Sequence, residues 1–181
     1  VGLRPSPGLV PTARKEMAWL PLWSEGPLAR SVGDLALSLQ AMAGRDARDP
    51  LSGFAAPGDF ADLRPASLDG LRFAVSEDLG FAPVSGQVHR LFRDRVEKIA
   101  KLVPCEDAVP PLSGADRCFE VLRAVSFLGQ LKSLVEKNPD KVGPNVTNNV
   151  KLGLTFSAAD VAEAMAAQTR LYHRFIDFMD G

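Results

Sequence analysis

The sequence has few of the residues that build metal and redox centres. It contains two cysteines, Cys105 and Cys118, and two histidines, His89 and His173, among 181 residues. The cysteine spacing matches no zinc or redox motif, and two histidines are too few for a multi-histidine site. We therefore expect no metal ion and no other cofactor, and we expect both cysteines to be free thiols.

An excess of charge of one sign and long apolar runs are also lacking. The formal net charge is −1, with 24% charged and 46% hydrophobic residues, as in an ordinary soluble globular protein. Without a basic excess we expect no nucleic-acid partner. No apolar run approaches the ~18 residues that a membrane helix needs, so we expect no membrane contact and a cytoplasmic location.

Motifs of common catalytic sites are missing as well. The sequence has no Gly-x-Ser-x-Gly, Ser-x-x-Lys, His-Glu-x-x-His or Gly-x-Gly-x-x-Gly pattern and no phosphate loop. Ser31, Ser113 and Ser157 each precede an aspartate by three positions, a spacing typical of helix starts. These serines are interpreted as helix caps, and no residue of the chain is assigned as catalytic.

The apolar pattern predicts helices alternating with short strands. A strand at 71–75, a helix at 85–103 and a short strand at 106–109 form the strand–helix–strand order of a layered α/β fold. Other helices are expected at 31–44, from 113 onward and at 157–179, whereas the polar segment 138–153 is interpreted as a mobile connection. We expect short parallel or mixed strands covered by at least four helices. The helix at 85–103 is expected to bury one apolar stripe, made of Val88, Leu91, Phe92, Val96, Ile99 and Leu102.

Two stretches near the beginning carry a more specific pattern. A Gly-Leu-Arg-Pro-Ser-Pro-Gly segment at 2–8 leads through a loop to Gly-Pro-Leu-Ala-Arg-Ser-Val at 26–32, and an Arg-Asp-Ala-Arg-Asp-Pro turn follows at 45–50. This order resembles the amidase signature family of amide hydrolases. The last predicted helix is similar to that family too, with a serine start, Arg170 near its middle and an aromatic-rich end at 178–180.

The resemblance implies a function but no catalytic residue in this chain. Members of the family hydrolyse amides with a Ser–cis-Ser–Lys triad, and the resemblance places all three positions upstream of Val1. It implies a partial amidase-signature domain over 1–181, which we expect to be truncated at both ends because the chain starts without methionine and stops after a helix. The implied role is the non-catalytic portion of a carboxamide hydrolase, inactive by itself. A stand-alone binding or scaffold module of the same fold is the main alternative, and an unrelated α/β enzyme is another.

Three aromatic residues are the candidates for substrate contact. Trp19 and Trp23 lie in the loop before the first helix, and Phe127 lies on a later helix; covering the core is the alternative role for all three. The expected partner in the whole enzyme is a small-molecule amide. Uncovered strand edges and apolar faces also predict binding of a missing segment of the same enzyme, or self-association.

Overall fold

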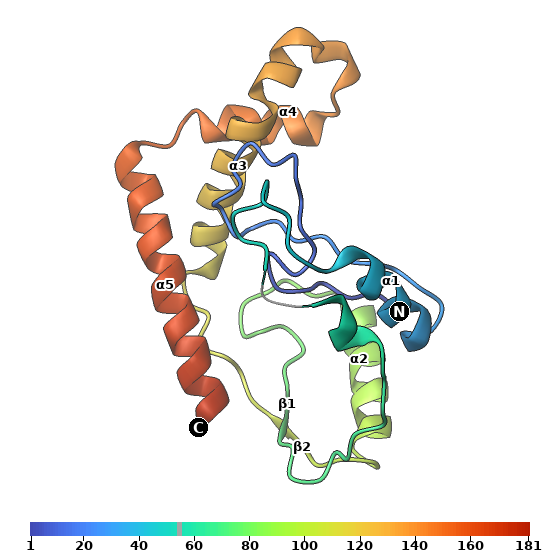
Figure 1. Ribbon diagram of the computed structural model, residues 1–181. Coiled ribbons are helices and arrows are strands. Elements are labelled where there is room, and N and C mark those ends of the chain that lie inside the picture. Colours follow the sequence, from blue (N-terminus) through green and yellow to red (C-terminus); the bar gives the residue numbers. More distant parts are fainter. Residues whose placement is uncertain (54–55) are drawn as a thin grey trace. The chain divides into compact units, whose positions relative to one another are not determined.

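The computed structural model describes residues 1–53 and 56–181 (Figure 1). This part of the chain forms two compact units, the first made of residues 1–65 and 121–157 and the second of residues 66–120 and 158–181. The expected α/β class with at least four helices is confirmed, since the described residues contain five α-helices and a small parallel sheet. The elements are α1 (Val32–Met42), the 3-10 helix η1 (Pro57–Phe60), β1 (Phe73–Val75), α2 (Gly86–Ile99), β2 (Cys105–Asp107), α3 (Ala115–Lys137), the 3-10 helix η2 (Pro139–Lys141), α4 (Pro144–Gly153) and α5 (Ala158–Asp180).

Serine caps start two of the predicted helices. The backbone N–H of Asp34 donates to Ser31 Oγ at 3.1 Å at the start of α1, and that of Val88 donates to Ser85 Oγ at 3.4 Å at the start of α2. A cap of this kind satisfies a backbone donor that has no partner within the helix. The geometry is local, and both starts were therefore predicted correctly.

The two amidase-like segments of the N-terminal region lie side by side in the first unit. The N–H of Leu3 donates to the carbonyl of Pro27 at 3.2 Å, and the N–H of Ala29 donates to the carbonyl of Val1 at 2.9 Å. Residues around Gly2 and Leu28 thus run antiparallel as an isolated bridge. The prolines of this region keep the pairing short, because a proline has no N–H to donate to a strand ladder.

The sheet of the second unit consists of two parallel strands. Phe73 pairs with Cys105 and Val75 pairs with Asp107, and α2 connects the two strands along the chain. The predicted strand–helix–strand order is confirmed, with β1 starting later and β2 starting earlier than expected. Both strands are three residues long.

The expected burial of the apolar stripe on α2 is wrong. No residue of this helix is buried; Val88 is 52% exposed, Leu91 53% and Ile99 47%. The half-buried side chains of α2 include His89 and Arg93, because these polar groups bind carboxylates that follow the strands. A two-stranded sheet in this unit offers too little surface to cover the whole stripe.

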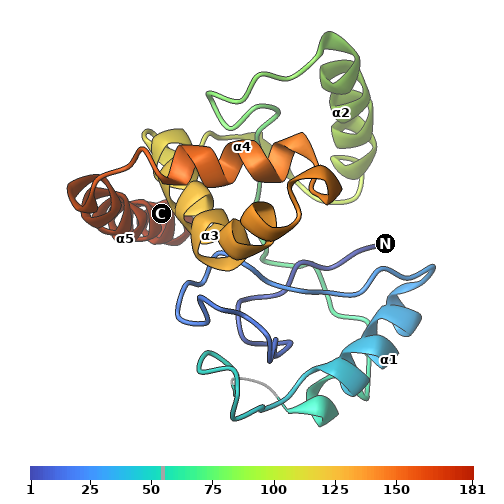
Figure 2. The same ribbon diagram turned by 90° about the horizontal axis from the view of Figure 1, so that it is seen from above.

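The prediction of a mobile connection at 138–153 is also wrong for most of that segment. Pro144 is the first residue of α4, a position at which a backbone N–H would have no partner within the helix. The helix crosses α3 in Figure 2, and Val150 and Gly153 are buried where it does so. Packing against α3 therefore stabilises a helix that its polar sequence did not suggest.

Candidate functional site

The side chains of Trp23 and Phe127 are in contact in the first unit. Their ring centroids lie 6.2 Å apart and the ring planes are tilted by 53°, an arrangement common among aromatic pairs. Trp23 lies in the loop before α1, and Phe127 lies on α3. The fold thus brings together two of the three aromatic residues that the sequence indicated.

A buried serine holds the indole in this position. Trp23 Nε1 donates to Ser126 Oγ at 2.8 Å, and Gln130 Nε2 donates to the same oxygen at 2.8 Å. Ser126 is 0% exposed. Because Ser126 and Gln130 lie four positions apart on α3, both side chains project from the same face of that helix.

The third aromatic candidate lies outside this pair. Trp19 is 77% exposed, and the ring contact described in this part of the chain joins Trp23 to Phe127. Trp23 is 37% exposed, and the guanidinium carbon of Arg123 lies 5.5 Å from the centroid of the Phe127 ring. The pair therefore presents a partly open aromatic surface, of the kind that binds apolar or aromatic groups of a ligand.

A buried ion pair anchors the loop that carries Trp23. Lys15 Nζ lies 3.7 Å from Asp49 Oδ2, and the two side chains are 5% and 0% exposed. The same ammonium donates to the backbone carbonyl of Trp23 at 3.4 Å. Asp49 also accepts the backbone N–H of Thr12 at 2.8 Å and that of Leu51 at 3.0 Å.

The charged form of Asp49 is favoured despite its burial. Burial by itself raises the pKa of a carboxyl group, but hydrogen bonds from the Thr12 and Leu51 N–H groups and the nearby Lys15 ammonium outweigh it. The pKa of Asp49 is therefore lowered. The carboxylate links the start of the loop, its centre and the 46–52 turn.

These polar residues were not among the candidates from the sequence. The four-residue spacing of Ser126 and Gln130 on a helix is a signal that could have paired them. No local pattern joins Lys15 to Asp49, since the two lie in different loops and meet only in the folded chain.

The second unit holds a separate ionic cluster where its two strands end. Arg93 Nε on α2 donates to Glu77 Oε2 at 2.8 Å, and Arg93 NH1 donates to Asp107 Oδ1 at 2.7 Å. His89 Nδ1 lies 3.2 Å from the same Glu77 oxygen. The Arg93 and His89 side chains lower the pKa of Glu77 to about 2, and Glu77 and Asp107 raise the pKa of Arg93. The cluster fastens α2 to both strands.

This cluster predicts an acid-sensitive second unit. The pKa of Glu77 falls from 4.5 to about 2 on folding, so its contribution to stability is present above the unfolded pKa and is lost as the pH falls through that range. The urea midpoint should therefore fall between about pH 7 and about pH 3, and the change should be smaller in Glu77→Gln. Glu97→Gln, on an exposed position of α2, is the matched control; an equal acid sensitivity in both variants would contradict the assignment.

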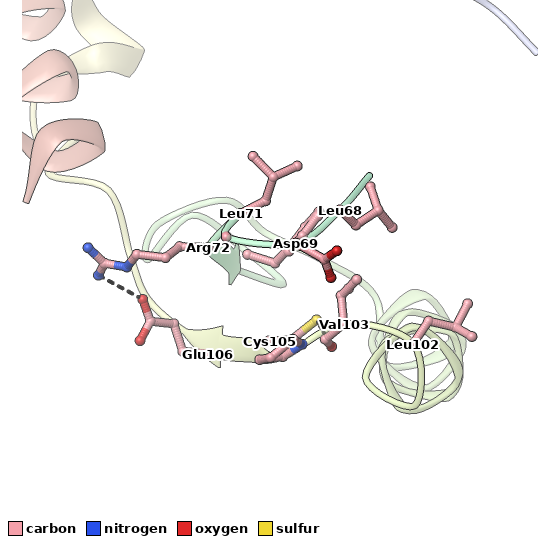
Figure 3. A pocket seen from close by; sticks show the side chains of 11 residues that line it. Leu68, Asp69, Leu71, Arg72, Leu102, Val103, Cys105 and Glu106 are labelled. Carbon is pink, nitrogen blue, oxygen red and sulfur yellow. Dashed lines mark hydrogen bonds and ion pairs between the residues drawn. The ribbon is translucent and has the colours of Figure 1, made fainter. Parts of the chain in front are cut away.

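A cavity of about 510 Å³ lies beside the amino ends of β1 and β2 (Figure 3). Arg72 NH2 and Glu106 Oε1 point toward one another there, 3.2 Å apart. The Cys105 thiol donates to the carbonyl of Val103 at 3.6 Å. Because its charged and thiol groups are paired with one another or with the backbone, we assign no reaction to this cavity.

Metal-binding clusters and membrane-spanning helices are both absent from the described part of the chain. Within residues 1–53 and 56–181, no group of three or more His, Cys, Asp or Glu side chains is arranged to hold a metal ion. Across the same ranges, no helix has the length and apolar character needed to cross a membrane.

Comparison with known sequences gives consistent matches. The model of the family described as Amidase matches residues 1–171. Acylamidase from Rhodococcus erythropolis is 33% identical over 102 residues, which are 56% of this chain and 21% of the acylamidase. The A-type subunit of the glutamyl-tRNA(Gln) amidotransferase from Pseudomonas savastanoi pv. phaseolicola is 27% identical over 201 residues, covering 95% of this chain and 42% of that protein.

Comparison with solved structures gives the same fold. A bacterial aryl acylamidase of the amidase signature family matches with a TM-score of 0.75 at 18% identity, covering 98% of this chain and 39% of that one. The 6-aminohexanoate cyclic dimer hydrolase matches with a TM-score of 0.72 at 17% identity, covering 99% and 40%. The chain thus spans less than half the length of these similar proteins.

Proposed function

Because this chain belongs to the amidase family, we propose that it supplies the non-catalytic part of a hydrolase that cleaves carboxamide C–N bonds. In this role it contributes strands, covering helices and part of the wall of the acyl pocket. The match of the family over residues 1–171 supports the proposal. The catalytic groups of the whole enzyme are then expected upstream of Val1.

The pocket wall is proposed to include Trp23 and Phe127. Their tilted rings are partly exposed, and the neighbouring Ser126 keeps the indole N–H paired, so the surface left open is largely aromatic. Such a surface favours an apolar or aromatic acyl group. The names of two similar proteins, acylamidase and aryl acylamidase, agree with an amide of this kind.

A hydrolysis assay tests the division of labour. Residues 1–181 alone are expected to leave a panel of aliphatic and aryl amides intact, whereas the protein encoded by the complete reading frame hydrolyses at least one of them. Hydrolysis by residues 1–181 alone would contradict the proposal. An inactive, monodisperse product of a reading frame that begins near Val1 would instead support a stand-alone binding module.

Alanine substitutions test the pocket wall. In the complete enzyme, Trp23→Ala and Phe127→Ala are expected to raise KM for aryl amides by about three- to tenfold, because each removes part of the buried apolar contact. We expect a smaller change for Trp19→Ala, since that ring is 77% exposed and lies outside the pair. Unchanged preference between aryl and small aliphatic amides in all three variants would remove these residues from the site.

The uncovered apolar side chains lead to a proposal about partners. Val88 and Leu91 on α2 are 52% and 53% exposed, and Tyr172 and Met179 on α5 are each 63% exposed. We propose that a further segment of the same enzyme, or a second copy of the chain, covers these surfaces.

Light scattering measures the outcome for residues 1–181 alone. We expect a molar mass above the 19.4 kDa of one chain, and a shift toward that value when Val88 and Leu91 are replaced by lysine. Glu97→Lys, which adds charge to α2 without removing an apolar side chain, is the control. A monodisperse 19.4 kDa species in the unmodified chain would contradict the partner proposal.

A further inference from the structure

We propose that Ser126 and Gln130 are positioning residues that hold the Trp23 indole in one orientation and thereby set the acyl preference of the enzyme. The inference rests on the proposed function, because it takes Trp23 to be part of the acyl pocket wall. Neither residue is required to touch the substrate. Their effect is transmitted through the indole.

The bond between the indole and the serine fixes the ring. A tryptophan N–H is a donor only, so the 2.8 Å bond to Ser126 Oγ uses its entire hydrogen-bonding capacity. Ser126 is 0% exposed, so water does not compete for that oxygen. Together with the contact to the Phe127 ring, this bond restricts both side-chain torsions of Trp23.

Gln130 supports the serine in its role as acceptor. A serine oxygen has two acceptor lone pairs, and here the Trp23 N–H and the Gln130 amide occupy one each, both at 2.8 Å. With both lone pairs engaged, the hydroxyl proton of Ser126 is directed away from the indole. Gln130 therefore keeps Ser126 in the state in which it accepts from Trp23.

The orientation of the indole in turn affects specificity. Trp23 is 37% exposed, so one part of the ring is anchored while another part remains open to a ligand. Small displacements of a substrate-positioning group have large effects on catalysis. Freeing the indole would widen the range of orientations that it adopts and weaken its contact with a flat acyl group.

Hydrogen exchange of the two indole N–H groups, followed by NMR, tests the positioning role. We expect the Trp23 indole N–H to exchange about tenfold more slowly than that of Trp19, as one protected hydrogen bond implies. Trp19→Phe assigns the two signals. Ser126→Ala should remove most of the difference, Ser126→Cys should retain part of it, and Gln130→Met should reduce it.

Ser133→Ala is the matched control, since it makes the same change at an exposed position of α3. It is expected to leave the exchange of both indoles unchanged. If Ser126→Ala also leaves the Trp23 exchange unchanged, the positioning inference is overturned whatever the enzyme's substrate preference.

A kinetic measurement on the complete enzyme provides the second readout. Ser126→Ala should raise KM for aryl amides by about three- to tenfold with kcat nearly constant, in the direction of Trp23→Ala. If the exchange changes but the KM of Ser126→Ala and that of Trp23→Ala do not, the indole is positioned but is not part of the pocket, and the specificity role fails. The two failures are therefore distinguishable.

Discussion

Asp49→Asn is expected to lower the free energy of unfolding by about 3 kcal/mol, because it leaves the buried Lys15 ammonium without its counterion. The two side chains are 5% and 0% exposed, so water cannot easily replace the lost partner. The asparagine also presents an N–H₂ group where the carboxylate accepts from Thr12 and Leu51. Urea denaturation followed by circular dichroism measures the change.

Two further variants separate charge from hydrogen bonding at this site. Lys15→Met is expected to cost less than Asp49→Asn, because the backbone donors of Thr12 and Leu51 still satisfy the carboxylate. The double variant is expected to cost less than the sum of the two single variants, which is the signature of a direct interaction. Asp62→Asn, at an exposed ion pair with Arg64, should leave the midpoint nearly unchanged. Equal effects at Asp49 and Asp62 would contradict a buried anchor.

Gly153→Ala is expected to lower the free energy of unfolding by about 2 kcal/mol through overpacking. A Cβ atom at this position would lie 2.6 Å from the carbonyl oxygen of Ala124 and 2.9 Å from Cβ of Leu128. Both belong to α3, and the closer one is a backbone atom that cannot move independently. Helix α4 would therefore have to shift away from α3, and thermal or urea unfolding measures the cost.

Two other glycines show that the expected effect depends on the neighbour. At Gly86, the first residue of α2, the nearest atom to a new Cβ is the Arg90 guanidinium at 3.8 Å, so Gly86→Ala should be neutral or slightly stabilising. At Gly129 a Cβ would approach the Met17 sulfur, which a flexible side chain can withdraw. An equal loss of stability at Gly86 and Gly153 would indicate that helix packing is not the cause.

Helix starts and the fold class could be predicted from the sequence because their causes are local. The caps at Ser31 and Ser85 bind N–H groups three residues ahead. The strand–helix–strand order around α2 follows from apolar patterns within one stretch of the chain. The order of the amidase-like segments at 2–8, 26–32 and 45–50 likewise needed no coordinates.

The wrongly predicted elements depended on surroundings that the sequence does not display. Helix α4 has a polar sequence with Pro144 at its start, and it is stabilised where Val150 and Gly153 meet α3. The stripe on α2 has the periodicity of a buried face, yet Leu91 remains 53% exposed. Periodicity reports which side chains share a face of a helix and not whether another element covers that face.

The candidate site shows the same division. Composition and motifs by themselves determined that this is an α/β chain of amidase type and indicated Trp23 and Phe127 as aromatic candidates. Only the tertiary structure decided that these two rings touch, that Ser126 and Gln130 anchor the indole, and that Lys15 meets Asp49. Capping and helical periodicity act over a few residues, whereas contacts between a loop and a distant helix arise only when the chain has folded, because nothing in the neighbouring sequence encodes them.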